Sequence, residues 1–481
     1  MRGEREPIML GKVFKAYDVR GVYPDPLNET MAWQIGYGVS RFLLQDAASA
    51  GETSPMMKNI VVGRDMRKSS PALCEALIRG ITDHGGNVLD VGMVDTSFIY
   101  FAVNHLDCAG GVMCTASHNP PQYNGFKVSR RKAKPVGEAT GLAEVRKYAA
   151  LVDRQHLQPG GGRVEPRDLW DAYRAHVLRF MDLGKRRGKK PLRVVIDASN
   201  GMAGTMIPRL FGKKGAGVDG LEIVELNFDN SRGEFAHEPN PLVAANVRQC
   251  SQAVVAQKAD AGFCYDGDAD RCVLVDERGA IVGCDQLTGA LCGAFLKQSP
   301  GAAVVYDLRS TKAVAEAIEK AGGVPVRSRV GHVFMKQAMA EHKGVFGGEL
   351  SGHFYFAGNF DADSGVIAMC TVLTLLAESG KRVSELVAPV ARYAQSGEIN
   401  FQIEDKDAAL AKLRHEFAGH GTIDELDGVT VDCFAAHGWW CNVRKSNTEP
   451  LLRLNLEARD RKSLEAALAR VAPMLGQRVE H

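Results

Sequence analysis

One local pattern occurs three times along this chain and restricts its fold more than any other feature. An apolar, β-prone run ends in Asp, and a polar turn then leads into a helix, as in NIVVGRDMRKSSPALCEALIRGI. The other copies are LRVVIDASNGMAGTMIPRLF and AAVVYDLRSTKAVAEAIEKAG, so the strand-ending aspartates are Asp65, Asp197 and Asp307. Strands that alternate with helices are typical of parallel α/β sheets, whose functional loops follow the carboxyl ends of strands. The pattern predicts three related α/β domains in series, and coincidence is the alternative because strand–Asp–turn–helix is common in α/β folds.

The last part of the chain has a different pattern. A strand-like EINFQIE precedes a helix-like DAALAKLRHEFAGH, short strands in GVTVDCF and WWCNVRK, and a final helix in SLEAALARVAPML. This order favours a smaller α+β domain. The expected fold is three related mixed α/β domains in series plus this C-terminal domain, with boundaries at 1–165, 166–281, 282–388 and 389–481.

Composition restricts the class of protein. The chain has 481 residues, of which 45% are hydrophobic and 24% charged, as is usual for a globular protein of several domains. A formal net charge of +2 argues against a nucleic-acid-binding surface. The eleven cysteines contain no CxxC pair, which fits reduced thiols in the cytosol. The N-terminus lacks the apolar core of a signal peptide, and no apolar run would span a bilayer, so we expect a cytoplasmic protein with no membrane partner.

The segment TASHNPPQYNGFK, which begins at Thr115, is the first candidate for chemistry. Its two prolines exclude regular structure, and the Asn124-Gly125 pair favours a tight turn. The small, apolar GGVMCTAS before it predicts a strand that delivers the loop. We therefore expect Ser117 and His118 to be exposed on a rigid loop at a strand end, where catalytic groups are often found. An ordinary surface turn is the alternative.

The segment AGFCYDGDADRCVLVDERG carries three alternating aspartates, Asp266, Asp268 and Asp270. Carboxylates this close repel one another unless a cation neutralises them, and all-oxygen ligation suits Mg²⁺. An EF-hand also spaces Asp in this way, and Glu277 stands where its last ligand would be, but Arg271 replaces the Gly that its turn needs. A haloacid-type phosphatase, with one Asp as nucleophile, is a serious alternative on this segment alone.

Two further loops carry polar groups suited to a sugar phosphate. GGELSGHFYF presents Glu349, Ser351 and His353, which would converge on sugar hydroxyls because alternate side chains of an extended segment point the same way. RKSNTEPLLR combines an Arg with hydroxyl and amide donors, which is the chemistry of phosphate capture. Its candidate residues are Arg444, Ser446, Asn447 and Thr448. Either loop alone would be interpreted as a polar surface turn.

Taken in order, these segments resemble the α-D-phosphohexomutase family, in particular bacterial phosphomannomutase/phosphoglucomutase. The matching stretches are FKAYDVRG, VVGRDMR, TASHNPPQYNGFK, DGDADR, VGHVFMK, GGELSGH and RKSNTEP. They run from Phe14 to Pro450, and four ordered loops are far more specific than any one motif. The resemblance implies four domains around a central cleft, which carry in order a phosphoserine, a metal-binding, a sugar-binding and a phosphate-binding loop.

The resemblance also implies roles for individual residues. Ser117 would carry a phosphoryl group, and Mg²⁺ would be held by an oxygen of that group and by Asp266, Asp268 and Asp270. The other residues implied at the catalytic centre are Arg20, His118, Lys127 and Arg271. Lys127 is expected to be the general acid/base, with a pKa lowered by nearby cations and the metal, and the alternative is that it only pairs with the phosphate. The implied substrate contacts are Tyr17, Arg309, His332, Glu349, Ser351, His353, Arg444, Ser446, Asn447 and Thr448.

The implied activity is the interconversion of hexose 1-phosphate and hexose 6-phosphate through a hexose 1,6-bisphosphate, which also acts as activator. We expect a phosphomannomutase with added phosphoglucomutase activity, an isomerase that acts on a phosphosugar as a monomer or weak homodimer. Phosphoglucosamine mutase, a catalytically silent sugar-phosphate-binding protein and a simple hydrolase are alternatives. Leu350 stands where phosphomannomutases commonly have Met, an exchange that alters no polar ligand. Arg309 stands where the bacterial group often has Lys, which puts the details of substrate contact in question. Asn447 favours the dual-specificity bacterial group.

Overall fold

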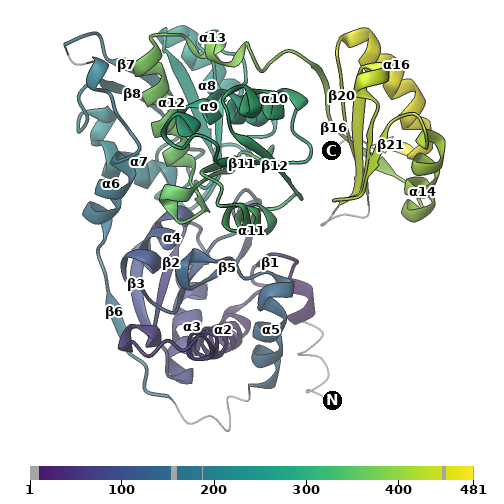
Figure 1. Cartoon of the computed structure of the whole chain (residues 1–481). Helices are drawn as coiled ribbons and strands as arrows, with labels where there is room; N and C mark the ends of the chain where they lie inside the picture. Colours follow the sequence, from purple (N-terminus) through teal and green to yellow (C-terminus); the bar gives the residue numbers. More distant parts are fainter. Residues whose placement is uncertain (1–9, 153–159, 187, 447–450, 480–481) are drawn as a thin grey trace. The chain divides into compact units, whose positions relative to one another are not determined.

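The computed structural model describes residues 10–152, 160–186, 188–446 and 451–479. The chain divides into two compact units, and Figure 1 labels many of their helices and strands. Unit 1 contains Met1–Gly283 and Ser351–Ser384, and unit 2 contains Cys284–Leu350 and Glu385–His481.

The first part of unit 1 is built on a six-stranded mixed sheet in the order β1-β5-β4-β2-β3-β6. Strands β4, β2, β3 and β6 are parallel, whereas β5 and β1 are antiparallel to their neighbours. The strands are β1 Val19–Val22, β2 Asn59–Arg64, β3 Asn87–Met93, β4 Gly110–Cys114, β5 Tyr123–Arg130 and β6 Val164–Pro166. The helices are α2 Glu29–Ser49, α3 Ser70–His84, α4 Thr96–His105 and α5 Leu142–Leu151. Because β2 and β4 are parallel neighbours, the loops that follow them lie at the same edge of the sheet.

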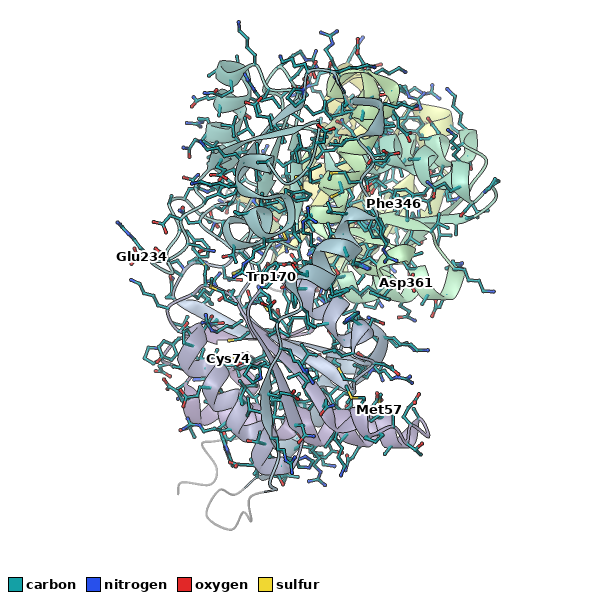
Figure 2. The ribbon with its side chains drawn as sticks, turned by 90° about the vertical axis from the view of Figure 1, so that its left-hand side faces the viewer. Met57, Cys74, Trp170, Glu234, Phe346 and Asp361 are labelled. Carbon is teal, nitrogen blue, oxygen red and sulfur yellow. The ribbon has the colours of Figure 1, made fainter. Side chains whose placement is uncertain are left out.

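Helices α2 and α3 lie side by side in this part of the molecule (Figure 1), and glycines stand at their contact. A Cβ at Gly36 would lie 2.1 Å from the Leu77 carbonyl oxygen, and a Cβ at Gly80 would lie 2.0 Å from that of Trp33. The backbones therefore approach more closely than any larger residue would allow. Cys74 of α3, labelled in Figure 2, is buried in the same core.

The second part of unit 1 has a four-stranded sheet in the order β10-β9-β7-β8. Strand β7 is parallel to β8 and β9, and β10 is antiparallel to β9. The elements are α6 Trp170–Leu178, β7 Leu192–Asp197, α7 Ala203–Phe211, β8 Leu221–Leu226, α8 Ala244–Gln257, β9 Ala261–Tyr265 and β10 Cys272–Val275. The later segment of unit 1 adds the antiparallel pair β14 Phe354–Phe356 and β15 Ala362–Asp363, followed by α12 Gly365–Ser379.

Unit 2 begins with three parallel strands in the order β12-β11-β13. Their elements are α9 Cys284–Gln298, β11 Ala303–Asp307, α10 Lys312–Lys320, β12 Val324–Ser328, α11 His332–His342 and β13 Phe346–Gly348. Phe346, labelled in Figure 2, stacks on Phe295 of α9 with ring centroids 4.6 Å apart. This contact packs a helix against the strands.

The C-terminal part of unit 2 is an antiparallel six-stranded sheet in the order β17-β18-β19-β20-β16-β21. Its strands are β16 Ala394–Gln402, β17 Thr422–Asp424, β18 Val429–Asp432, β19 Trp439–Lys445, β20 Leu452–Ala458 and β21 Gln477–Val479. The helices are α13 Val383–Val387, which precedes the sheet in the sequence, α14 Lys406–Phe417, the short α15 Phe434–His437 and α16 Arg461–Val471.

The predicted class of three mixed α/β domains and a smaller C-terminal domain is confirmed. In the described residues, no helix combines the length and the apolar character needed to cross a membrane.

The three aspartates of the repeated pattern stand at equivalent places. Asp65 directly follows β2, and Asp197 and Asp307 are the last residues of β7 and β11. In each case a carboxylate oxygen accepts a hydrogen bond from the backbone N–H two residues later, an arrangement that begins a tight loop. The three donors are Arg67 at 3.0 Å, Ser199 at 2.9 Å and Arg309 at 2.8 Å. The strand–Asp pattern therefore corresponds to a repeated local structure.

Candidate active site

Ser117 lies in the loop between β4 and β5, and its surroundings differ in two ways from the sequence prediction. Its side chain is buried, with 2% of the residue exposed, instead of exposed on a surface loop. The Asn124-Gly125 pair does not form a turn, because both residues belong to β5 and Gly125 pairs with Arg20 of β1. A Cβ at Gly125 would lie 1.9 Å from the Val19 carbonyl oxygen, so close strand pairing is what requires glycine here.

The backbone of Ser117 is in the left-handed region, with a φ of 50°. This conformation is uncommon for a residue with a Cβ, and such strain collects at functional sites. Ser117 N–H donates to Thr115 Oγ1 at 3.0 Å, and Ser117 Oγ donates to Asp266 Oδ2 at 2.8 Å. The loop therefore directs the serine hydroxyl at the acidic turn.

The acidic turn joins β9 to β10, and its three aspartates are buried. Carboxylate oxygens of Asp266, Asp268 and Asp270 all lie within 4.8 Å of one another. Gly267 lets this turn approach the serine loop, since a Cβ there would lie 2.4 Å from the Ser117 carbonyl oxygen. The flanking elements are strands, so the turn is not an EF-hand, whose loop joins two helices.

The oxygen atoms of the acidic turn fit a hard divalent cation. Among the described residues, Asp268 Oδ1 is buried and takes part in no hydrogen bond. Thr96 Oγ1 donates to Asp268 Oδ2 at 2.6 Å and orients that carboxylate. Burial, together with repulsion from Asp270 and Asp268, raises the pKa of Asp266 well above its usual range. A bound cation would relieve this repulsion through carboxylate oxygens, which are ligands that Mg²⁺ prefers.

Lys127 of β5 reaches into the acidic turn. Its Nζ donates to Asp268 Oδ2 at 2.7 Å and to Asp270 Oδ2 at 2.6 Å. Burial alone would lower the pKa of Lys127, but attraction to these carboxylates outweighs burial and raises the pKa. The predicted lowering of this pKa is therefore wrong for the turn without a bound cation, because the groups nearest the ammonium are carboxylates and not other cations.

Two arginines lie close to the same centre. Arg20 of β1 forms an ion pair with Asp18, and its Nη1 donates to Asn119 Oδ1 at 2.5 Å. Arg271 ends the acidic turn, with its Nε 3.8 Å from Asp266 Oδ2. Arg20 therefore lies at the serine loop, and Arg271 lies at the carboxylates, as the sequence predicts for both.

His118 stands beside the serine and is half-buried. Repulsion from Arg271, together with burial, lowers the pKa of His118 well below its usual value. The ring is therefore neutral at pH 7, and its Nδ1 is 3.3 Å from Ser117 Oγ. Tyr17 lies just before β1 in the same unit.

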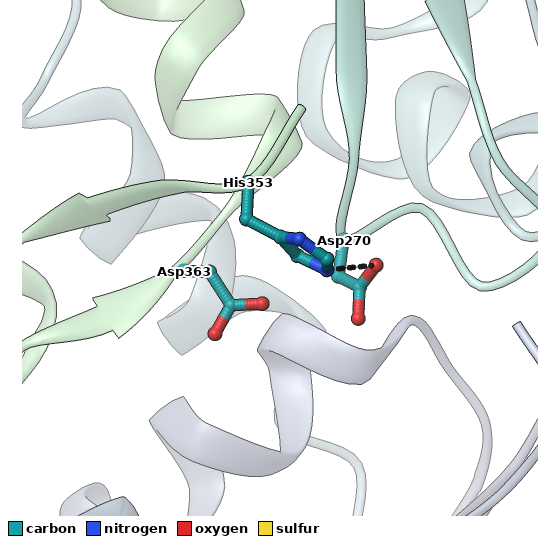
Figure 3. Close-up of side chains that lie close together, drawn as sticks. All are labelled: Asp270, His353 and Asp363. Atoms are coloured by element: carbon teal, nitrogen blue, oxygen red, sulfur yellow. Dashed lines mark ion pairs between the residues drawn. The ribbon is translucent and has the colours of Figure 1, made fainter. Parts of the chain in front are cut away.

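His353 approaches the acidic turn from the later segment of unit 1. Its Nε2 is 3.4 Å from Asp270 Oδ1, and its Nδ1 is 2.8 Å from Ser351 Oγ. Figure 3 shows the imidazole between Asp270 and Asp363, which comes from β15. Ligand atoms of these three residues also lie within 4.8 Å of one another. Because Asp270 belongs to both groups, they form a single acidic centre.

The predicted sugar loop is not extended. The chain turns after Glu349, and Gly352 takes a φ of 89°, so the simple alternation of side chains expected for this segment is wrong. Within unit 2, Glu349 Oε1 is 3.8 Å from Arg309 Nη2. The backbone N–H of Leu350 donates to Asp307 Oδ2 at 2.7 Å, which ties this loop to the end of β11.

Three arginines of unit 2 share one carboxylate. Glu398 Oε2 is 3.4 Å from Arg309 Nη1 and 3.2 Å from Arg444 Nη2, and Glu398 Oε1 is 3.0 Å from Arg453 Nη1. Arg444 and Arg453 stand opposite each other on β19 and β20. Burial acts to raise the pKa of Glu398, but the three arginines together lower it. The carboxylate is therefore charged and balances a cationic cluster.

The remaining predicted residues are also in unit 2. His332 is the first residue of α11, and Ser446 directly follows β19, where its N–H donates to the Leu451 carbonyl oxygen at 2.9 Å. Asn447 and Thr448 lie outside the described residues.

Sequence reasoning missed three contributors: Glu398, Thr96 and Arg67. For Glu398 a signal existed, because pairing the two arginine-bearing strands would have placed like charges opposite each other and required a counter-charge. For Thr96 there was none, since the residue it orients is 172 positions away in the sequence. Arg67 was part of a matching stretch, VVGRDMR, but nothing in that stretch indicated which atoms its guanidinium would reach.

Comparisons with known proteins cover most of the chain. The phosphoglucomutase/phosphomannomutase family matches in four parts: alpha/beta/alpha domain I over residues 11–151, domain II over 171–279, domain III over 284–393 and the C-terminal domain over 398–474.

Individual relatives agree with this match. A protein of Xanthomonas campestris pv. campestris named "Phosphohexose mutases" is 39% identical over 466 residues, which cover 96% of this chain and 98% of the relative. A phosphomannomutase of Salmonella typhimurium is 37% identical over 469 residues, which cover 96% and 99%. The crystal structure of a phosphoglucomutase/phosphomannomutase family protein from Burkholderia thailandensis has a TM-score of 0.82 at 30% identity, over 96% of this chain and 95% of that chain.

Proposed function

Because the chain belongs to the phosphoglucomutase/phosphomannomutase family and is a phosphohexose mutase, an isomerase of sugar metabolism, we propose that it interconverts mannose 1-phosphate and mannose 6-phosphate. The glucose phosphates are its proposed second substrates. Ser117 carries the transferable phosphoryl group, and a hexose 1,6-bisphosphate is the intermediate and activator. We further propose that the enzyme acts in the cytoplasm as a monomer or weak homodimer.

One observation carries this proposal: the Ser117 hydroxyl is hydrogen-bonded to Asp266 at the edge of a buried turn of three carboxylates. A phosphoryl group on Ser117 Oγ would share a cation with these carboxylates, which is the arrangement that phosphoryl transfer needs. A haloacid-type phosphatase would instead use an aspartate of this turn as nucleophile. All three carboxylates already accept hydrogen bonds, from Ser117, Thr96 and Lys127, whereas the Ser117 hydroxyl is the donor in its bond to Asp266, which favours the serine.

The proposed reaction has two half-reactions. In the first, the bond between phosphorus and Ser117 Oγ breaks as phosphorus bonds to the 6-hydroxyl oxygen of a hexose 1-phosphate. The sugar hydroxyl loses a proton and Ser117 Oγ gains one. In the second, the bond between phosphorus and O1 of the sugar breaks as phosphorus bonds to Ser117 Oγ. Ser117 Oγ loses its proton, O1 gains one, and the hexose 6-phosphate leaves.

Nearby side chains are assigned to proton transfer and to phosphate contacts. We assign to Lys127 the proton that Ser117 Oγ gains, because the Lys127 ammonium is protonated and lies at the acidic turn. Arg20, His118 and Arg271 are proposed to contact the phosphoryl oxygens, since a guanidinium suits charge-assisted hydrogen bonds to phosphate.

A Mg²⁺ ion held by Asp266, Asp268, Asp270 and a phosphoryl oxygen on Ser117 would withdraw charge from the phosphoryl group. The chain's own part is to keep these carboxylates in place. Thr96 orients Asp268, and the Lys127 ammonium balances the turn while no cation is bound. Thr96 begins α4 and Lys127 belongs to β5, so both contacts come from the first part of unit 1.

The substrate contacts remain proposals by family resemblance. The sugar would be bound by Glu349, Ser351 and His353, with Tyr17, Arg309 and His332. The phosphate distal to Ser117 would be bound by Arg444, Ser446, Asn447 and Thr448. Since the bisphosphate must be bound in two orientations, the hydroxyl contacts have to serve both poses.

A ³¹P NMR competition assay tests this function. Mannose 1-phosphate, glucose 1-phosphate and glucosamine 1-phosphate are mixed with the protein, Mg²⁺ and a trace of hexose bisphosphate. We expect rapid formation of mannose 6-phosphate, with or without glucose 6-phosphate. The Ser117→Ala variant should lose nearly all turnover. Ser231→Ala is a matched control, because Ser231 also bonds to an aspartate, Asp229 at 2.6 Å, but on the exposed surface.

Each other result has a defined meaning. Dominant formation of glucosamine 6-phosphate would keep the family and change the substrate. Release of free phosphate without an isomer would indicate a hydrolase. Binding without turnover would indicate a silent sugar-phosphate-binding protein. A Ser117→Ala variant with the wild-type rate would exclude the phosphoserine.

A further inference from the structure

A fully buried arginine ties the Ser117 loop to the end of β2. The Arg67 side chain is 0% exposed, and a guanidinium carries five N–H donors. Nε donates to Asp65 Oδ2 at 3.1 Å. The other four donors reach backbone carbonyl oxygens of the serine loop: Pro120 at 2.7 Å and Tyr123 at 3.1 Å from Nη1, and Ser117 at 2.8 Å and Asn119 at 2.7 Å from Nη2. Every donor of this guanidinium is therefore used.

These bonds satisfy polar groups that the loop cannot pair by itself. Pro120 and Pro121 have no N–H, so this loop has fewer backbone donors than carbonyl acceptors. A buried carbonyl left without a partner costs about 1–3 kcal/mol. Because four carbonyls converge on one planar group, the loop backbone is held in a single shape. That shape includes the left-handed φ of 50° at Ser117.

The groups around Arg67 act on the same loop. Asp65, which receives the Arg67 Nε bond, also accepts a hydrogen bond from Thr115 Oγ1 at 2.8 Å. Thr115 Oγ1 in turn accepts from the backbone N–H of Ser117 at 3.0 Å. The ring of Phe235 lies against the guanidinium, 5.0 Å from its central carbon. Arg67 is thus held in place on several sides, and its bond to the Ser117 carbonyl oxygen holds the backbone of Ser117 in turn.

The same Asp-x-Arg arrangement recurs in unit 2 with a different use. Arg309 donates from Nε to Asp307 Oδ1 at 3.2 Å and from Nη2 to Asp307 Oδ2 at 2.8 Å. Its Nη1 is directed at a carboxylate, that of Glu398. Arg67 instead directs four donors at carbonyl oxygens. Contact with the serine loop is therefore particular to the first copy and not a by-product of the repeated turn.

We propose that Arg67 is a positioning residue for phosphoryl transfer, which holds the loop so that Ser117 Oγ faces Asp266. The inference rests on the proposed function of Ser117. Arg67 bonds to the backbone of the loop and does not bond to the Ser117 hydroxyl. A displacement of about 1 Å can reduce a rate by about 100-fold, because transfer depends on alignment of the reacting atoms. Sugar-phosphate binding is made by other groups, so KM should be preserved.

Three variants test this role in the full chain: Arg67→Met, Arg67→Lys and Arg174→Met. Arg174 is the control, because it also donates to backbone carbonyls, those of Leu210 at 2.8 Å and Gly217 at 3.1 Å, although it is only partly buried. For Arg67→Met we expect kcat to fall by about 100-fold with KM within about threefold of wild type. Arg67→Lys, with three donors in place of five, should fall between this variant and wild type. Arg174→Met should keep both constants.

Amide hydrogen exchange of residues 115–123 is measured on the same samples. A folded Arg67→Met with kcat within threefold of wild type would overturn the proposal. If Arg67→Met does not fold, Arg67→Lys decides in the same way. If wild type itself makes no hexose 6-phosphate, the proposed function fails and exchange alone decides. Faster exchange of residues 115–123 in Arg67→Met than in Arg174→Met would then support the positioning role. Equal exchange in the two variants would overturn it.

Discussion

At the scale of single residues, the acidic turn is a balance between carboxylates that repel one another and a lysine that holds them together. Asp268 contributes an oxygen that bonds to Lys127 and Thr96 and another that makes no hydrogen bond. The second oxygen is buried, and it belongs to the group whose atoms fit a cation. A change from carboxylate to amide here keeps the shape and removes one charge. Its effect on metal binding is therefore easy to separate from its effect on folding.

For Asp268→Asn we expect Mg²⁺ activation and turnover to weaken together, with the Mg²⁺ concentration for half-maximal rate raised by about tenfold or more, since one ligand charge is lost. The measurement is activity against Mg²⁺ concentration, with calorimetric titration of the metal. Asp276→Asn is the control, because Asp276 is a buried aspartate just after β10 that pairs with Arg278. Unchanged Mg²⁺ dependence in Asp268→Asn would remove the metal assignment.

Asp95 makes the stability of unit 1 depend on pH. Burial raises its pKa to about 7, although Tyr173 OH donates to its carboxylate at 2.8 Å. The folded protein then keeps a proton that the unfolded chain releases above about pH 4. Stability from this group is therefore lost as pH rises from about 4 to about 7, and it is level above that.

Asp95→Asn cannot titrate, so it should lack this loss. Relative to wild type, its free energy of unfolding should rise by about 2–3 kcal/mol between pH 5 and pH 8, since one pKa unit corresponds to about 1.4 kcal/mol. Urea unfolding at the two pH values, without metal, gives the measurement. Asp95 is the N-cap of α4, and the control is Asp460→Asn at the exposed N-cap of α16, which should show no such change. If the free energy of unfolding of Asp95→Asn differed from that of wild type by the same amount at pH 5 and pH 8, the prediction would be contradicted.

At the scale of elements, a glycine in a helix has opposite effects depending on what the helix touches. A Cβ at Gly80 of α3 would lie 2.0 Å from the Trp33 carbonyl oxygen, whereas a Cβ at Gly293 of α9 would meet nothing within 4 Å. Gly80→Ala should destabilise unit 1 by about 1–3 kcal/mol through overpacking. Gly293→Ala should stabilise unit 2 by about 0.5–1 kcal/mol through helix propensity. Thermal unfolding of both variants tests this pair, and shifts of the same sign would contradict it.

Strands β16, β19 and β20 carry the charge balance of the C-terminal sheet. Glu398 lies among three arginines, two of which oppose each other across β19 and β20. Its replacement by glutamine leaves their repulsion uncompensated. We expect Glu398→Gln to lose about 1–2 kcal/mol of stability, because the carboxylate is partly exposed and solvent screens its ion pairs.

An added anion should restore part of this loss. Inorganic phosphate supplies the negative charge that Glu398→Gln lacks, so it should raise the Tm of this variant more than that of wild type. Glu465→Gln, which breaks an exposed pair with Arg461 on α16, is the control and should respond as wild type does. An equal phosphate response in Glu398→Gln and wild type would show that the carboxylate does not compete with anions at Arg444.

At the scale of the whole molecule, long-range pairing explains what sequence reasoning could and could not anticipate. The three aspartates, the acidic turn and the serine loop are local patterns, and each lies where it was expected, at the end of a strand or between two strands. The Asn124-Gly125 pair was misassigned because its glycine is required by a neighbouring strand and not by a turn. The raised pKa of Lys127 was also missed, because it depends on carboxylates 141 and 143 residues away.

The amino-acid sequence by itself determined the α/β class and the order of the domains, because strand, turn and helix signals act over a few residues. Only the tertiary structure decided which of these groups meet. It buried Ser117, joined the segment Ser351–Ser384 to unit 1, and aimed every donor of Arg67 at its partners. The physical reason is that burial, hydrogen bonding and charge balance at this centre are set by groups distant in sequence. Only when the fold brings these groups together are the protonation states and orientations of the side chains determined.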